Sequence, residues 1–303
     1  MSKKGKGNSK RIQGKGLKNA LARHIQAENV KSKKQKTLED KNSVTSISKR
    51  KNILDGRGYV PFDENTYLLL VGEGDFSFAT SLISHNYIEG NKLIATGYDE
   101  KEESYQKYPS AQENISFLES HGIKVLHKID ATKLETCLKL HNLKKKKDAA
   151  VNNYRRINCI MFNFPHSGKG IKDVERNIRD HQLLVSNYLK SSINTFDIIA
   201  ANDDNIYNKH GASPGIKTVI LTVFEGEPYD SWNVKGLAKS LGFKVVRSSF
   251  FDWTLYPEYH HRRTNSMKDT TKPAHERNAR MYIFTKDDIS EGILLNNQPL
   301  DDE

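Results

Sequence analysis

Apolar runs of five to eight residues recur along the chain between residues 67 and 285, and polar segments with helical spacing separate most of them. Short apolar runs predict buried strands, whereas apolar residues that recur every three or four positions predict amphipathic helices. The predicted strands are 67–71, 92–97, 123–128, 157–162, 217–224, 243–250 and 280–285.

Helical spacing occurs between the first six of these strands. The predicted helices are 76–86, 101–120, 131–141, 172–192 and 230–241. This alternation predicts an α/β fold with a seven-stranded, mostly parallel sheet and helices on both faces. The last two strands have no helix between them, so we expect the seventh strand to be antiparallel. Two polar segments, 144–156 and 200–215, are predicted to be loops.

Positive charge is concentrated at the start of the chain. Residues 1–57 contain 17 Lys and Arg against four Asp and Glu, a net charge of +13; since the whole chain carries +11, the remainder sums to about −2 (11 − 13). This segment has too few apolar residues to form a core, so we expect a disordered basic tail over 1–57, a folded domain over 58–290 and a short tail over 291–303. Clustered lysines suit a polyanion or a nuclear import receptor, and a solubilising extension is the alternative.

Several classes of protein are disfavoured by what the sequence lacks. It has no apolar run of about 18 residues, which argues against a membrane span. The two cysteines, Cys137 and Cys159, form no metal-binding or redox spacing, so we expect neither a disulfide framework nor a metal site, and a reducing compartment fits best.

The first predicted strand runs into the turn Gly72-Glu73-Gly74-Asp75. Such glycine turns bring backbone N–H groups against nucleotide-like ligands, and no Gly-Lys-Ser/Thr follows to indicate a phosphate-binding loop of the NTPase kind. Asp99 ends the second strand, where a carboxylate can bind a ribose. Asp130 ends the third, where it either faces an adenine or caps the next helix. A dinucleotide and S-adenosylmethionine both fit these positions.

The fourth predicted strand ends in Asn163-Phe164-Pro165-His166. This sequence resembles the Asn/Asp-Pro-Pro-aromatic loop of class I methyltransferases that act on planar nitrogens. Pro165 stiffens the loop, the Asn163 amide can donate to or accept from a base, and a flat side chain can stack on it. The alternative is a rigid loop with a structural asparagine.

Six segments together carry a wider resemblance: "LLVGEGDFSFATSL", "ATGYDE", "IMFNFPHSGKG", "NIRDHQLLVSNYLKS", "LTVFEGEPYDSWNV" and "YPEYHHRRT". They are similar to the eukaryotic family of large-subunit rRNA uridine-N3 methyltransferases, which have a Rossmann-like class I domain. The resemblance implies a nucleolar, S-adenosylmethionine-dependent enzyme that methylates N3 of one uridine in 25S-type rRNA during ribosome biogenesis. We expect a monomer that acts on large-subunit rRNA or a pre-ribosomal particle.

The resemblance also implies roles for individual residues. Gly72, Glu73, Gly74 and Asp75 would hold the methionine part of the cofactor, Asp99 its ribose and Asp130 its adenine. Asn163 would bind the uracil edge, with Phe164 and Pro165 as the ring platform. His166 is the one side chain of this loop that ordinarily titrates near neutral pH, so it is either the base or a hydrogen-bonding group.

RNA contacts are expected from basic and aromatic residues outside the cofactor turn. Aromatic rings beside guanidinium groups in "YPEYHHRRT" suit single-stranded RNA. The predicted RNA-binding residues are Lys169, His260, Arg262 and Arg263. A metal site from His260, His261 and His275 is a weaker alternative. A methyltransferase on another RNA or a protein, and a non-catalytic assembly factor of the same fold, remain rival functions.

Overall fold

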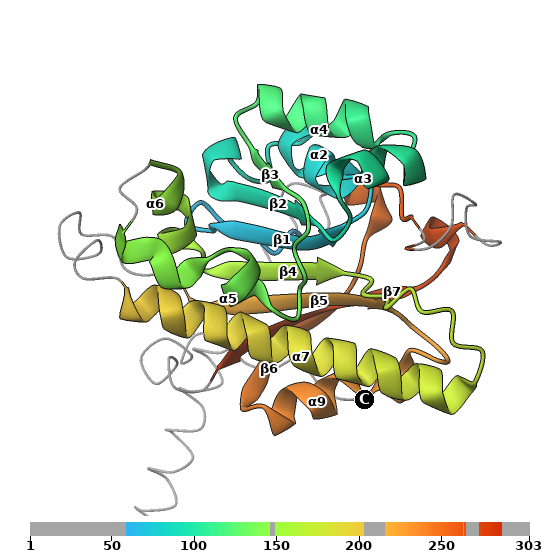
Figure 1. Ribbon diagram of the computed structural model, residues 1–303. Coiled ribbons are helices and arrows are strands. Elements are labelled where there is room, and N and C mark those ends of the chain that lie inside the picture. The colour runs from blue at the N-terminus through green and yellow to red at the C-terminus, as the bar shows by residue number, and fades with distance from the viewer. Residues whose placement is uncertain (1–58, 146–148, 203–215, 263, 265–272, 287–303) are drawn as a thin grey trace, which may run out of the picture. The chain divides into compact units, whose positions relative to one another are not determined.

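A seven-stranded sheet forms the centre of the folded unit (Figure 1). The computed structural model describes residues 59–145, 149–202, 216–262, 264 and 273–286, so both predicted tails lie outside it. The strands run in the order β3-β2-β1-β4-β5-β7-β6. Their bounds are β1 Leu68–Glu73, β2 Leu93–Gly97, β3 Lys124–Leu126, β4 Cys159–Asn163, β5 Thr218–Phe224, β6 Phe243–Phe250 and β7 Ala279–Lys286.

Strand direction confirms the prediction of a mostly parallel sheet with an antiparallel last strand. β1 pairs in parallel with both β2 and β4, and β7 pairs antiparallel with both β5 and β6. After β3 the chain returns to the middle of the sheet and adds β4 on the other side of β1. The order therefore reverses between β1 and β4, where doubly wound sheets bind ligands at their carboxyl edge.

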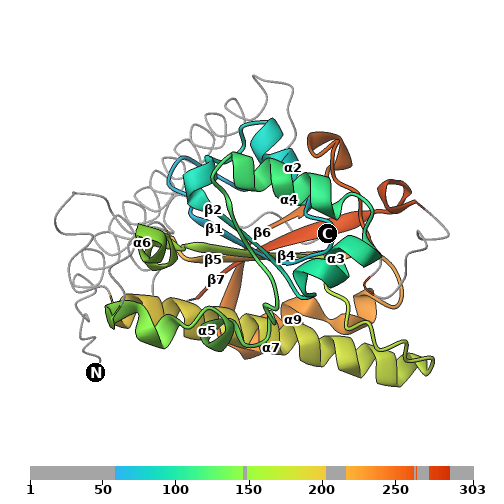
Figure 2. The same cartoon turned by 45° about the horizontal axis from the view of Figure 1, so that its top comes forward.

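Helices cover both faces of the sheet (Figures 1 and 2). One face carries α2 (Ser77–Ser84), α3 (Lys101–Lys107) and α4 (Ala111–Ser120), and the other carries α5 (Leu134–Cys137), α7 (Val174–Ala201) and α9 (Val234–Ser240). α6 (Ala149–Arg156) packs beside α7. Short 3₁₀ turns complete the described elements: η1 Gly90–Lys92, η2 Leu140–Lys145, η3 Asp230–Trp232, η4 Trp253–Leu255 and η5 Ala274–Glu276.

The alternation of strand side chains divides the core into two layers. Leu68 and Leu70 of β1 pack with α2 and α4, whereas Leu69 and Val71 pack with α7. All four are at most 1% exposed, so β1 is buried on both faces, as its continuous apolar sequence predicts.

The predicted helix 101–120 is interrupted, and the cause lies in the sequence. α3 ends at Lys107, and Tyr108 adopts an extended conformation with φ −126°. The next residue is Pro109, whose ring disfavours a helical conformation in the residue before it. The chain therefore restarts as α4 at Ala111.

Two predictions about the connections were wrong. The segment up to Arg156 was predicted to be a loop, yet Ala149–Arg156 forms α6, which buries Tyr154 against the core. α7 continues to Ala201 instead of ending near residue 192, because Phe196 and Ile199 extend its buried face. The remaining part of the predicted loop, 203–215, lies outside the described residues.

Two features bear on the classes of protein that the sequence disfavours. Among the described helices, none combines the length and apolar character needed to span a bilayer. Cys137 and Cys159 are both free thiols, and Cys159 is buried in β4.

Candidate active site

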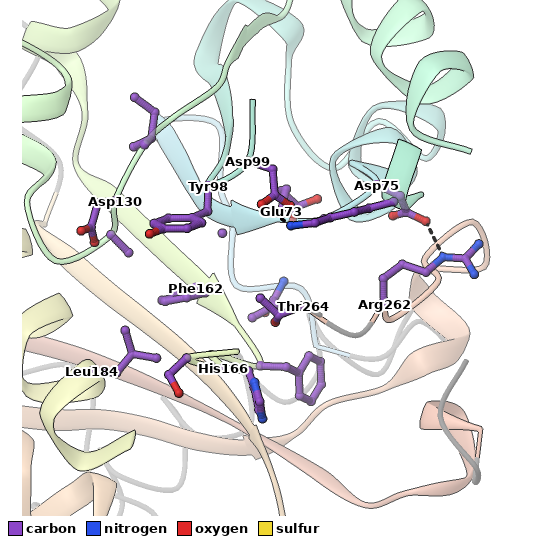
Figure 3. Close-up of a pocket in the computed structure, with 18 of the residues that line it drawn as sticks. Glu73, Asp75, Tyr98, Asp99, Asp130, Phe162, His166, Leu184, Arg262 and Thr264 are labelled. Atoms are coloured by element: carbon purple, nitrogen blue, oxygen red, sulfur yellow. Dashed lines mark hydrogen bonds and ion pairs between the residues drawn. The ribbon is translucent and has the colours of Figure 1, made fainter. Parts of the chain in front are cut away.

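A cavity of about 900 Å³ opens at the carboxyl edge of the sheet, where the strand order reverses (Figure 3). The ends of β1, β2 and β4 line it, together with the loops after β3 and β6. Asp99 and His166 lie on opposite sides of this opening in Figure 3. Of the predicted site residues, those that line it are Gly72, Glu73, Gly74, Asp75, Asp99, Asp130, Asn163, Phe164, His166, Lys169, His260 and Arg262.

Gly72 fixes the shape of the turn that begins in the last residues of β1. Its φ of +72° is a conformation that side chains strongly disfavour, and a Cβ there would lie 2.2 Å from Cε2 of Phe162. Phe162 is buried in the neighbouring strand β4. The turn therefore keeps its backbone exposed to the cavity only with glycine at this position.

Asp75, predicted to lie near the cofactor's amino group, is held by protein donors. Oδ1 accepts hydrogen bonds from the backbone N–H and hydroxyl of Ser77, at 3.1 and 2.6 Å. Oδ2 accepts from the hydroxyl of Ser110 at 2.9 Å and from Nε of Arg262 at 3.0 Å. Since the side chain is only 3% exposed and accepts these four hydrogen bonds, its main role in the structure is to hold Ser77, Ser110 and Arg262 in place.

The loop after β6 is fastened at three successive points, two on α2 and one on the turn before it. Glu258 accepts from the hydroxyl of Ser81 at 2.6 Å, the backbone N–H of His260 donates to the hydroxyl of Ser77 at 2.9 Å, and Arg262 pairs with Asp75. We call residues 258–262 the clasp loop. It carries two of the predicted RNA-binding residues to the rim of the cavity, and Arg263 lies outside the described residues.

Two carboxylates reach the cavity from the ends of β2 and β3. Asp99 accepts from Nζ of Lys107 at 2.8 Å, and burial followed by the charge of Asp99 raises the pKa of Tyr108 to about 12, so that this phenol stays protonated beside it. Asp130 accepts from the backbone N–H and hydroxyl of Thr132 at 2.9 and 2.7 Å through Oδ1 alone. A carboxylate has about four acceptor positions, so both groups keep capacity for a ligand.

Glu73, between the two glycines, has an unusual environment. Burial, and after it the negative charge of Asp75, raise the pKa of the Glu73 carboxyl to about 8, although the backbone N–H of Ala79 opposes the shift. The side chain is half-buried at the cavity wall. It therefore changes charge just above neutral pH.

Asn163 ends β4 with one half of its amide occupied. Its Oδ1 accepts the hydroxyl proton of Thr222, in the neighbouring strand β5, at 2.7 Å. Its Nδ2 is buried and has no hydrogen-bond partner among the described residues. Leaving such a donor unpaired costs about 1–3 kcal/mol, a cost that an acceptor oxygen of a ligand would remove.

The two residues after Asn163 are packed more deeply than a ring platform requires. Phe164 is 8% exposed, and its ring lies 4.4 Å from that of Phe224 and 5.3 Å, nearly parallel, from that of Trp253. Pro165 is buried and does not line the cavity. Phe164 contributes part of its surface to the wall, and its main contacts are with the core.

His166 is exposed at the rim of the cavity. Its Nδ1 accepts the backbone N–H of Gly168 at 3.0 Å, which requires that the neutral ring carry its proton on Nε2. The ring also lies 4.8 Å from that of the buried His181. Lys169 follows on the same loop and pairs with Asp180 of α7.

The structure adds Tyr98 to the site and also brings in His261, which the sequence offered only as an alternative metal ligand. Tyr98, just before Asp99, projects its ring into the cavity and is 65% exposed (Figure 3). His261 lies edge-on to Phe164, and burial, followed by the charge of Arg277, lowers its pKa to about 4. Only the position of Tyr98 beside Asp99 could have signalled such a role. Within the described ranges, no three His, Cys, Asp or Glu residues could hold a metal ion.

Known proteins place this site in a family. The family model described as "BMT5-like: rRNA (uridine-N3-)-methyltransferase BTM5-like" matches residues 69–263. The chain is 41% identical, over an alignment of 319 positions that spans 94% of each protein, to the 25S rRNA (uridine(2634)-N(3))-methyltransferase of Saccharomyces cerevisiae. It is 27% identical over 242 positions to the human ferredoxin-fold anticodon-binding domain-containing protein 1, covering 76% of this chain and 34% of that protein.

Among solved structures, TrmN from Thermus thermophilus is similar at 14% identity and a TM-score of 0.38, over 74% of this chain and 44% of that one. So low a score adds nothing to the fold described above. The family match and the yeast relative cover most of the sheet and its cavity. The chain therefore belongs to the BMT5-like family of rRNA (uridine-N3-)-methyltransferases.

Proposed function

We propose that this methyltransferase transfers a methyl group from S-adenosylmethionine to N3 of one uridine in large-subunit rRNA. The observation that carries the proposal is the single cavity in which the glycine turn, Asp99 and Asn163 meet on three strand ends. Family membership supports the same reaction. The yeast relative, which acts on a uridine of 25S rRNA, supports the substrate.

The cofactor's parts fit the residues of the first three strand ends. Gly72 and Gly74 bring the backbone of the turn to the cavity wall for the methionine part. Asp99 has acceptor capacity for the ribose hydroxyls, and Asp130 has a second carboxylate oxygen for the adenine amino group. S-adenosylmethionine supplies an activated methyl group on its sulfonium. The chain's task is then to align the uracil nitrogen, which is where most of the rate enhancement of such a transfer arises.

Uracil N3 carries a proton and lies between two carbonyl groups. Methylation would form an N3–C bond as the S–CH3 bond of the cofactor breaks to leave S-adenosylhomocysteine, and it would release the N3 proton, with charge accumulating on the flanking oxygens as that proton leaves. Asn163 and His166 both offer N–H groups from the β4 loop, and the Gly168 bond favours the donor role of His166 over a role as base. The proton passes to water at the exposed rim. The uridine must leave any helix to enter the cavity.

The tail and the clasp loop are the proposed RNA contacts. The +13 charge of residues 1–57 suits a phosphate backbone and a nucleolar protein, and His260 and Lys169 extend the contact to the cavity rim. Deletion of residues 1–57 should weaken RNA binding and flatten its dependence on salt, measured by filter binding between 50 and 300 mM KCl. An unchanged salt slope would assign the contact to the folded domain.

One experiment tests reaction and substrate together. We expect rRNA nucleosides from cells that lack the gene to lose one N3-methyluridine by mass spectrometry, and the purified full chain to restore it in the presence of S-adenosylmethionine. A methyl group appearing on another RNA or on protein would replace the proposed substrate. An intact rRNA modification together with defective ribosome assembly would favour the non-catalytic role.

A further inference from the structure

The oxygen and the nitrogen of the Asn163 amide, at the end of β4, have different environments. Oδ1 is bonded to Thr222, and Nδ2 is buried without a partner among the described residues. The residue is only 8% exposed, yet it lines the cavity. Its orientation therefore decides what the cavity presents to a base.

The direction of the hydrogen bond follows from Thr222. This residue is fully buried in β5, and across the described ranges its hydroxyl has no acceptor other than Asn163. If the amide were turned over, Thr222 would accept from Nδ2 and its own proton would be left buried and unpaired. That arrangement costs about 1–3 kcal/mol more, so the fold favours Oδ1 toward Thr222.

We infer that Thr222 holds Asn163 so that Nδ2 donates to O4 of the target uracil, and that this donor selects uridine over cytidine. This inference rests on the proposed function. The uracil edge presents O4 beside N3, whereas cytosine presents an amino group there and adenine an amino group beside N1. An N–H facing an amino group leaves two buried donors opposed, which discriminates strongly. Thr222 is thus a positioning residue and Asn163 the residue that reads the base.

The amide does not distinguish every base. Guanine also offers a carbonyl oxygen, at O6, so its exclusion falls to the size of the cavity and its other contacts. The specific expectation concerns the exchange of carbonyl for amino group at a pyrimidine of unchanged size.

The test uses the full chain and two RNAs that differ only in uridine or cytidine at the target position. Thr222→Val removes the hydroxyl, Thr222→Ser keeps it, and Asn163→Asp replaces the donor with an acceptor. We expect Thr222→Val to lower kcat at least tenfold and to reduce the preference for uridine, while Thr222→Ser stays within threefold of wild type. Asn163→Asp should lower uridine methylation at least a hundredfold and shift relative affinity toward the cytidine RNA.

Two readouts keep folding and function apart. Calorimetric binding of S-adenosylhomocysteine should be unchanged in Thr222→Val, which shows an intact cofactor site. Equilibrium binding of the two RNAs needs no turnover, so it tests the inference even if the proposed reaction fails. Wild-type kcat and uridine preference in Thr222→Val, or a wild-type preference in Asn163→Asp, would overturn the inference. So would methylation of a base that presents an amino group in place of the carbonyl.

Discussion

The two halves of the cavity differ in how completely their polar groups are satisfied. On the side of β1, β2 and β3, the carboxylates of Asp75, Asp99 and Asp130 all accept hydrogen bonds from neighbouring protein groups. On the side of β4, the buried Nδ2 of Asn163 has no partner in the described part of the chain. The polar groups of the first side are therefore held by the protein itself, whereas the second side leaves one buried donor to be paired by a ligand under the proposed function.

This difference matches two kinds of ligand. A cofactor bound in the same way at every turnover benefits from groups that are already fixed, because their ordering costs nothing at binding. A substrate base gains selectivity from a protein donor that is costly to leave unpaired. Substitutions on the two sides should therefore fail differently, the first mainly in cofactor affinity or stability and the second in rate and base preference.

The largest expected effect on stability comes from a substitution on the side of β1, β2 and β3. Gly72→Ala adds a Cβ 2.2 Å from the Phe162 ring at a φ of +72°. Overpacking and backbone strain together should lower the free energy of unfolding by about 2–6 kcal/mol and abolish cofactor binding. Urea unfolding and calorimetry measure the two. Gly122→Ala is the control, since its φ of +74° carries strain alone, with nothing within 4 Å of the new Cβ, and should cost about 1–2 kcal/mol.

Substitution of Asp75 tests whether the stability of the β1, β2 and β3 side of the cavity depends on a buried charge. Asp75→Ala leaves Arg262 half-buried without its carboxylate and removes the acceptor of Ser77 and Ser110, so we expect a loss of about 2–4 kcal/mol in urea unfolding. Glu175→Ala, which breaks an exposed pair with Arg179, should change stability by less than about 1 kcal/mol. Equal effects of the two variants would contradict the structural role of Asp75.

Substitution of Asp99 tests the cofactor side of this comparison at the proposed ribose contact. Asp99→Ala should weaken S-adenosylmethionine binding by about 1–3 kcal/mol, because the ribose hydroxyls lose a buried acceptor. Glu113→Ala, on the exposed surface of α4, should leave the affinity unchanged. Calorimetric titration measures both, and NAD should not bind either variant. Wild-type affinity in Asp99→Ala would remove this carboxylate from the cofactor site.

The smallest expected effect concerns the charge of Glu73. Its carboxyl, with a pKa of about 8, is neutral at lower pH and negative at higher pH. The affinity for the cationic S-adenosylmethionine should therefore rise as the pH passes 8, by less than about tenfold, since a partly exposed pair contributes about 1 kcal/mol.

The demethylated product supplies the internal control for Glu73. Its sulfur is uncharged, so the affinity for S-adenosylhomocysteine should stay flat over the same pH range, and Glu73→Gln should make the curve for S-adenosylmethionine flat as well. A rise in the product's affinity that parallels that of the cofactor would assign the titration to a change in the fold.

The sequence predicts the strands and the three strand ends of the site because those signals are local. A buried strand is recognised as an apolar run; Gly72 and Asn163 directly follow one, and Asp99 comes two residues after one. The hydrogen-bond partners of these residues cannot be predicted in this way, because they lie far from them in the sequence. Thr222 lies 59 residues after Asn163 and meets it only through the β4–β5 pairing.

Arg262 is a second residue whose partner could not be predicted from the sequence. It was expected to contact RNA, and that expectation stays a prediction, but its Nε is bonded to Asp75, 187 residues away in the sequence. No local pattern distinguishes a basic residue that faces solvent from one that pairs with a buried carboxylate. α6 was missed for a different reason: it spans only eight residues and directly follows a lysine-rich segment, so its helical spacing is too short to stand out from a loop.

The contacts of the clasp loop predict a thermodynamic link between the two proposed ligands, the cofactor and the RNA. Because Ser77, Ser81 and Asp75 hold this loop to α2 and to the turn before it, we expect a cofactor that steadies the turn to steady the proposed RNA-binding surface as well. Such coupling is reciprocal, so RNA must tighten cofactor binding by the same factor. The spent cofactor and the modified RNA are then expected to leave in a coordinated sequence, each departure weakening the hold on the other.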